Sequence, residues 1–175
     1  DYGGFPEHTY HVQYAAPGSP QTAERVRSLI AGAGISVRMD AERGFDHGMF
    51  SPMAVIYPEA NVPVLQLSLK AGLDPKDHLA LGRVLAPLRD EDVLIVGSGL
   101  SYHNLREFGP RAQGTSQAFD RWLQDAVVAS TPAERTRKLI DWEAAPAARR
   151  AHPREEHLLP LMVAVGAAEG EAAAC

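Results

Sequence analysis

The sequence has 175 residues, of which 45% are hydrophobic and 22% charged, and its formal net charge is −5. This length and composition predict one soluble globular domain with a substantial core. The negative charge argues against a nucleic-acid partner, because neutralising phosphates requires a basic patch, and no apolar run approaches the roughly 20 residues of a membrane span. The single cysteine, Cys175, excludes an intramolecular disulfide and suits a reducing compartment, so we expect a cytoplasmic protein.

Predicted helices and strands alternate along the chain after an irregular first segment, 1–18. Ser or Asp followed by Pro is a typical helix start, because the side chain caps the helix and proline fits its first turn. Helices are predicted from Ser19-Pro20 to Gly32 or Gly34, over Ser51–Tyr57, from Asp74-Pro75 onward, over 116–129 and 132–142, and over Leu158–Ala168. Strands are predicted at Ile35–Met39, Val62–Leu69 and Asp92–Gly97. This alternation indicates an α/β domain with a central, mostly parallel or mixed sheet flanked by helices, followed by a frayed tail over 169–175.

His103 is the strongest candidate for acid–base chemistry. It follows the predicted strand Asp92–Gly97 and the sequence Gly97-Ser98-Gly99, which we expect to form a sharp turn. Ligand sites of open α/β sheets lie at the carboxyl ends of strands, and a histidine there can act as a general acid or base. The alternative is a loop histidine that bonds a backbone carbonyl. A phosphate-binding loop is not favoured, because the dinucleotide fingerprint and the P-loop lysine are both absent.

His47 lies in a second glycine-bracketed loop, between Asp46 and Gly48. Asp46 could fix the imidazole tautomer. Alternatively, Asp46 bonds its own backbone in a turn and His47 is solvated. Three further histidines, His8, His11 and His78, are expected at the surface.

His152 and His157 are separated by five positions. That spacing differs from the i, i+4 pair of His-Glu-x-x-His, and Pro153 interrupts any helix between them, so a local two-histidine zinc site is not expected. One of them could still join a metal site completed by distant groups. The alternative is a polar helix N-terminus, where Glu155 and Glu156 suit the helix dipole.

Several motifs considered together resemble those of a known family. They are Phe45–Gly48, Tyr57–Ala60, Pro63–Ser68, Gly97–Gly99 with His103–Leu105, and Pro153–Leu161. In this order and spacing, from about Gly4 to about Ala168, the chain resembles the class III extradiol ring-cleavage dioxygenases. More narrowly, it resembles their 4,5-DOPA-dioxygenase-like branch.

The resemblance implies an enzyme that opens a catechol ring beside its two hydroxyls with O2. The catechol could be DOPA-like, and the cofactor is a mononuclear non-haem Fe(II), although zinc can occupy the same site. A facial set of protein ligands leaves open positions on such a metal. His103 matches the acid–base histidine, and His47 matches a second active-site histidine that binds substrate or oxygen. His157 matches a metal ligand, with Glu156 a weaker candidate.

The resemblance also implies two further metal-binding histidines in a region that precedes the matched segments. The chain begins Asp1-Tyr2-Gly3-Gly4, without methionine. We therefore expect residues 1–175 to be a single catalytic-type domain, the C-terminal part of such a dioxygenase, lacking its N-terminal portion. Alone, it need neither hold iron nor turn over, unless His8 or His11 substitutes. The exposed sheet edge could lead to a homo-oligomer.

Two other functions remain open. One is a metal-free, non-enzymatic scaffold or binding protein with the same fold, and the other is a zinc-dependent hydrolase that uses the same residues. The presence of histidine at three motif positions, 47, 103 and 157, favours the dioxygenase.

Overall fold

The computed structural model describes residue 4 and residues 6–174, and the chain divides into two compact units, Asp1–Ser68 and Leu69–Cys175. Within the described residues, no helix combines the length and apolarity that crossing a bilayer requires.

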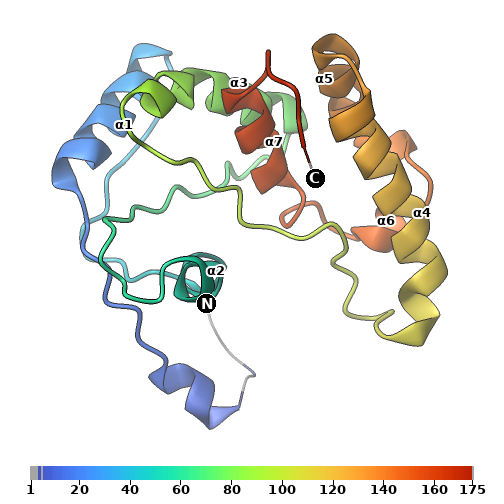
Figure 1. Ribbon diagram of the computed structural model, residues 1–175, viewed down its shortest axis with the longest axis horizontal. Helices are drawn as coiled ribbons and strands as arrows, with labels where there is room; N and C mark the ends of the chain where they lie inside the picture. The colour runs from blue at the N-terminus through green and yellow to red at the C-terminus, as the bar shows by residue number, and fades with distance from the viewer. Residues whose placement is uncertain (1–3, 5, 175) are drawn as a thin grey trace. The chain divides into compact units, whose positions relative to one another are not determined.

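The first unit contains a short 3-10 helix and two α-helices, labelled in Figure 1: η1 (Glu7–His11), α1 (Pro20–Gly32) and α2 (His47–Ile56). The predicted start of α1 is confirmed, because the Ser19 side chain accepts a hydrogen bond from the Thr22 N–H at 3.3 Å. Helix α2 starts at His47, four residues before the predicted Ser51. The reason is that Asp46 caps it, accepting from the Met49 N–H at 3.3 Å, so that Pro52 lies inside the helix.

The second unit is built from helices joined by extended segments. In chain order they are α3 (Pro75–Leu85), η2 (Ala86–Asp90), η3 (Pro110–Ala112), α4 (Gln113–Gln124), the π-helical η4 (Asp125–Ala129), α5 (Pro132–Ile140), η5 (Trp142–Ala144), α6 (Ala148–Ala151) and α7 (Leu159–Ala167). The capping residues predicted for two of them are confirmed. Asp74 accepts from the Lys76 N–H ahead of α3, and Thr131 forms a capping box with Glu134 ahead of α5.

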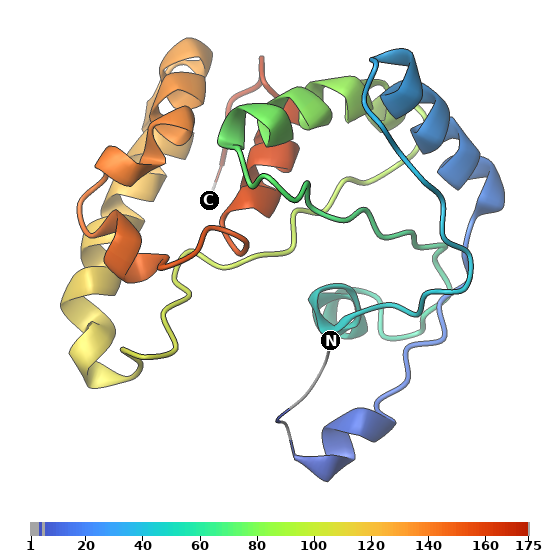
Figure 2. The same ribbon diagram turned by 180° about the vertical axis from the view of Figure 1, so that it is seen from behind.

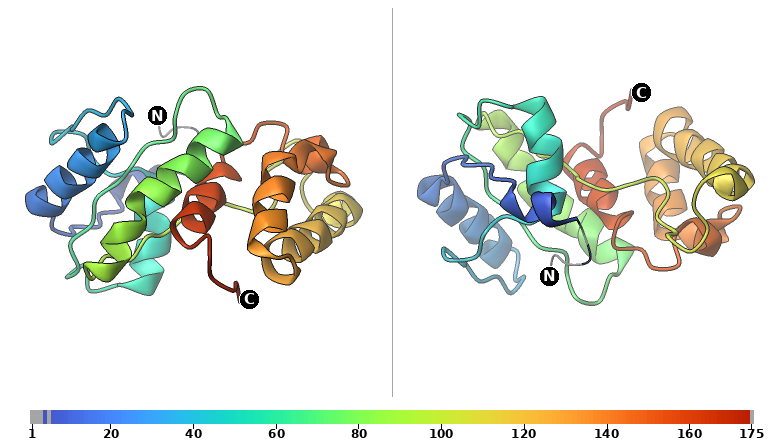
Figure 3. Two further views of the ribbon diagram at one scale, coloured as in Figure 1. Left: turned by 90° about the horizontal axis from the view of Figure 1, so that it is seen from above. Right: turned by 90° about the horizontal axis from the view of Figure 1, so that it is seen from below.

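Helices α3 and α7 pack closely because glycines face each other (Figure 3). A Cβ atom on Gly82 would lie 2.2 Å from the Val163 carbonyl oxygen, and one on Gly166 would lie 2.2 Å from the Leu79 carbonyl oxygen. Helices α4 and α5 lie side by side, as Figure 2 shows from behind. The core of this unit includes Phe119 of α4 and Trp142 of η5, whose rings meet edge to face at 6.5 Å.

The predicted central sheet is wrong: the described residues contain no strand. Residues 35–39, 63–69 and 93–97 lie outside any helix or turn, but no ladder of backbone hydrogen bonds joins them, and Asp92 lies in a turn with φ 57°. An apolar run becomes a strand only when a neighbour accepts and donates along its length. Segment 92–97 is an apolar run with no paired strand beside it among the described residues. Two of its apolar side chains are therefore exposed, Leu94 at 69% and Val96 at 47%.

The predicted surface position of His78 is also wrong, because this residue of α3 is fully buried. Both ring nitrogens bond backbone groups. Nδ1 lies 2.7 Å from the Asp74 carbonyl oxygen, to which it donates, and Nε2 accepts from the Lys70 N–H at 3.2 Å. This histidine therefore completes a local turn ahead of α3.

Candidate functional site

Two segments of the second unit, 100–104 and 150–157, run antiparallel and carry two of the predicted site residues, His103 and His157. Their hydrogen bonds join Leu100 N–H to His157 O (2.9 Å), His103 N–H to Ala151 O (2.9 Å), and the Asn104 side-chain amide to Arg150 O (2.8 Å). The motif around His103 and the motif around His157 are thereby held together, although more than fifty residues separate them in the sequence.

Gly97 and Gly99 allow this close approach. A Cβ atom on Gly99 would lie 2.2 Å from the His157 carbonyl oxygen, and one on Gly97 would lie 2.5 Å from the Pro160 carbonyl oxygen. Neither glycine has a positive φ, and the chain is extended here. The predicted sharp turn at Gly97-Ser98-Gly99 is therefore wrong. These glycines are required for space between two backbones and not for a bend.

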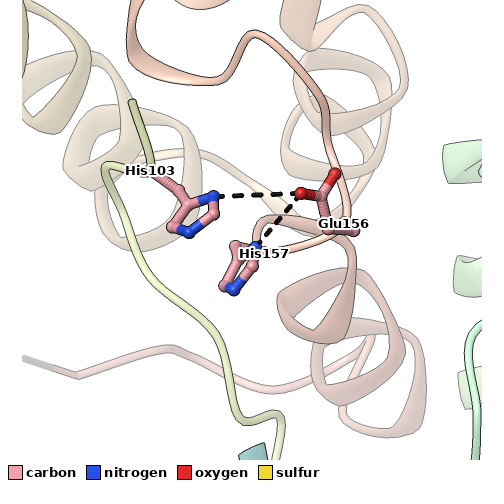
Figure 4. Close-up of side chains that lie close together, drawn as sticks. All are labelled: His103, Glu156 and His157. Atoms are coloured by element: carbon pink, nitrogen blue, oxygen red, sulfur yellow. Dashed lines mark ion pairs between the residues drawn. The ribbon is translucent and has the colours of Figure 1, made fainter. Parts of the chain in front are cut away.

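His103, Glu156 and His157 form one cluster, shown in Figure 4. The imidazole rings of the two histidines stack with centroids 3.4 Å apart and planes inclined by 20°. The Glu156 Oε1 atom faces both rings, 3.8 Å from His103 Nδ1 and 3.5 Å from His157 Nδ1. The three side chains are between 21% and 30% exposed, so solvent and small molecules can reach them.

The cluster brings together the donor atoms of a possible metal site. One ligand atom from each residue lies within 4.8 Å of the other two. Ligand atoms that are bound at about 2.0–2.2 Å and lie on one face of an ion are about 3 Å apart, so the three side chains must move closer together to bind a metal. Two imidazoles and one carboxylate are also the ligand types of the facial triad that binds non-haem Fe(II). Geometry alone fits His103 either as a ligand or as a base beside the metal.

The surroundings of Glu156 and Glu155 order the loop that carries them. Arg154 Nε lies 3.5 Å from Glu156 Oε2. Arg149 donates to Glu155 at 2.6 Å and to Glu143 at 2.6 Å while its guanidinium covers the Trp142 ring at 4.6 Å. This network anchors the loop before α7 to the core of the second unit.

His47 belongs to the first unit, where it is the exposed first residue of α2. The Asp46 carboxylate accepts from the N–H of Met49 and from the side-chain amide of Gln66. This agrees with the alternative in which Asp46 bonds its own backbone. His8 and His11 lie exposed in η1, as predicted.

The sequence considered His152 as a possible member of a metal site but did not predict its burial. Its ring is fully buried, and Nε2 lies 3.1 Å from the Ser101 carbonyl oxygen, beside the segment that carries His103. The local sequence Ala151-His152-Pro153 does not signal this burial, because the covering rings come from elsewhere in the chain. For Gly97 and Gly99 a signal existed, because residues two apart in an extended segment face the same side.

Comparison with known proteins gives a consistent result. The family described as the catalytic LigB subunit of aromatic ring-opening dioxygenase matches residues 1–174. The 4,5-DOPA dioxygenase extradiol of Beta vulgaris is 44% identical over 175 residues, covering 96% of this chain and 63% of that protein. The protein of the same name from Escherichia coli K12 is 36% identical, covering 98% of this chain and 64% of that protein.

A solved structure agrees with these relatives. The crystal structure of an uncharacterized protein from Escherichia coli K12 superposes with a TM-score of 0.76 at 32% identity, covering 93% of this chain and 67% of that one. The chain spans somewhat less than two thirds of the length of the curated relatives it matches. The family predicted from the motifs is confirmed: the chain belongs to the LigB family of aromatic ring-opening dioxygenases.

Proposed function

We propose that the protein opens a catechol ring in the extradiol manner with O2 at a mononuclear metal. The observation that carries this proposal is the cluster of His103, Glu156 and His157 in a member of this family. The names of the relatives, 4,5-DOPA dioxygenase extradiol, support a DOPA-like catechol as substrate. Fe(II) is the proposed metal, and zinc is the competing occupant.

His157 and Glu156 are the proposed metal ligands. When bound, Fe(II) would supply a site at which a catechol and O2 are held side by side. The carboxylate of Glu156 would offset part of the positive charge. Because Leu100 donates to the His157 carbonyl at 2.9 Å, the backbone of His157 is fixed and its imidazole needs little reorganisation to bind.

His103 is the proposed acid–base residue. Its Nδ1 side faces Glu156, so we assign proton transfer to Nε2. There the neutral imidazole takes a proton from a catechol hydroxyl and later returns one to the opened product. His47 stays a prediction as the histidine that contacts substrate or oxygen.

The test measures metal and oxygen on the complete protein as its gene encodes it. The protein is loaded anaerobically with Fe(II), desalted, and assayed for iron, O2 uptake and ring-fission absorbance with DOPA and simpler catechols. We expect iron to be retained and one O2 to be consumed per catechol. Retained iron without O2 uptake contradicts the dioxygenase. Loss of all metal on desalting favours the non-enzymatic scaffold. Conversion of a substrate by the zinc-loaded protein without O2 uptake favours a hydrolase.

His103→Ala separates the two roles of this residue. We expect it to keep its iron and to lose roughly 10²- to 10⁴-fold in kcat, because a general base has been removed. Metal analysis and steady-state kinetics on the same preparation measure both effects. Loss of iron from this variant would show that His103 is a ligand.

His157→Ala tests the ligand assignment. We expect most of the iron to be lost and activity to follow, while the fold is retained because the ring is partly exposed. Arg121→Ala, at an exposed position of α4 in the same unit, is the control. Unchanged iron content in His157→Ala would contradict the assignment.

A further inference from the structure

His152 lies in an apolar pocket within the second unit. Its side chain is 0% exposed. The ring meets Phe119 at 5.1 Å and Trp142 at 6.1 Å, both edge to face. Phenylalanine would fill such a pocket without any polar atom, so packing alone does not require an imidazole here.

The two ring nitrogens of His152 are used differently. Nε2 lies 3.1 Å from the Ser101 carbonyl oxygen. Because a carbonyl only accepts, Nε2 carries the proton and donates, and Nδ1 holds the lone pair. Nδ1 is buried and has no hydrogen-bond partner among the described residues. Burial lowers the pKa of this imidazole, which keeps it neutral. The bond to Ser101 is therefore the one polar contact that the ring provides.

That bond acts on the chain that carries His103. The Ser101 carbonyl is bound by the His152 ring, and the His103 N–H donates to the carbonyl of Ala151 at 2.9 Å. Two consecutive residues, Ala151 and His152, therefore hold the backbone on both sides of Tyr102. Tyr102 itself packs against the core and donates to the Glu107 carbonyl at 2.6 Å.

We propose that His152 is a positioning residue whose bond to Ser101 fixes the backbone of segment 101–103 and thereby aligns the His103 imidazole beside His157. The effect on catalysis rests on the proposed function, but the effect on the backbone does not. Misplacing a catalytic group by about an ångström can cost roughly 10²-fold in rate.

The first test needs no substitution and no activity. Histidine ¹⁵N spectra of the complete wild-type protein should show His152 in the Nε2–H tautomer with a slowly exchanging ring proton. An Nδ1–H tautomer or a rapidly exchanging proton would overturn the proposal, whether or not the protein is a dioxygenase.

The second test compares His152→Phe, which fills the pocket without a donor, with His152→Gln, which keeps an N–H donor. We expect the His103 amide to exchange at least about tenfold faster in His152→Phe and to be protected again in His152→Gln. Amides of α5 should be unchanged in both. Equal loss of protection in α5, or unchanged protection at His103, would overturn positioning.

Kinetics extend the test if the wild type is active. With iron content unchanged, His152→Phe should lose roughly 10- to 100-fold in kcat with little change in KM, and His152→Gln should recover much of it. An unchanged kcat in His152→Phe would overturn the catalytic part. An inactive wild type refutes the proposed function and leaves the backbone tests to decide the positioning role.

Discussion

Two buried histidines of the second unit, His78 and His152, show how the same side chain serves different ends. His78 bonds backbone groups four and eight residues away with both nitrogens, and so completes a local turn. His152 bonds a carbonyl 51 residues away with one nitrogen and leaves the other without a partner among the described residues. Full local pairing indicates a role in folding, whereas a single long-range bond at the cost of a buried unpaired nitrogen points to a role in holding the site.

The largest effect on the site is expected from Gly99→Ala. The new Cβ would lie 2.2 Å from the His157 carbonyl oxygen, so the two backbones must separate. Segment 101–103, which His152 holds at Ser101, would then lose the neighbouring hydrogen bond from Leu100 to the His157 carbonyl. We expect metal binding and activity to fall at least about 10²-fold and the free energy of unfolding to fall by about 1–3 kcal/mol.

Gly114→Ala is the control for this substitution, because a Cβ atom at that position would meet no other atom within 4 Å and alanine suits the first turn of α4. Metal content, turnover and urea denaturation on both variants measure the difference. Normal metal binding in Gly99→Ala would show that the close approach does not position His157.

Replacing each buried histidine with phenylalanine sharpens the comparison between them. His78→Phe leaves the Lys70 N–H and the Asp74 carbonyl without the ring, and should cost about 2–4 kcal/mol in the free energy of unfolding. His152→Phe removes one bond and one unpaired nitrogen together, and should cost less than about 1.5 kcal/mol. Turnover per folded molecule should fall only in His152→Phe. A larger stability loss at position 152 would reverse the assignment of the two roles.

Three helix starts, those of α1, α3 and α5, could be predicted from the sequence because their determinants are local, whereas the start of α2 at His47 was missed. Ser19, Asp74 and Thr131 each cap the helix that begins at the next residue. The sheet could not be predicted in this way, since an apolar run such as 92–97 specifies an extended chain but not the neighbour that would pair with it.

The candidate site was predictable in part. The motifs around His103 and His157 predicted chemistry at both positions, and the structure brings the two rings into contact. What holds them there was not predictable from local sequence. The space that Gly99 leaves is filled by the backbone of His157, which lies far along the chain. Likewise, the burial of His152 depends on Phe119 and Trp142, which its neighbours in sequence do not reveal.

The smallest expected effect is the pH dependence of stability contributed by His152. Burial is the main cause that lowers the pKa of this imidazole, and the hydrogen bond to the Ser101 carbonyl is the next largest influence and opposes it; His103 and His157 lower the pKa by less, and Glu156 raises it. In the unfolded chain the group titrates near its ordinary value of about 6.5. Its contribution is therefore fully present above that pH and declines as the pH falls toward the folded pKa, by at most about 1.4 kcal/mol per pH unit.

Urea denaturation from about pH 7.5 to about pH 5.0, a range that spans the ordinary histidine pKa, measures this contribution on the wild type and on His152→Phe. The wild type should lose more stability on acidification, and the difference between the two proteins should shrink as the pH falls, because only the wild type takes up a proton at this position on unfolding. Parallel curves for the two proteins would mean that His152 binds a proton equally well in the folded and unfolded states. That result would contradict the conclusion that His152 is buried as a neutral imidazole. The contrast between the roles of His152 and His78 would then lose its basis.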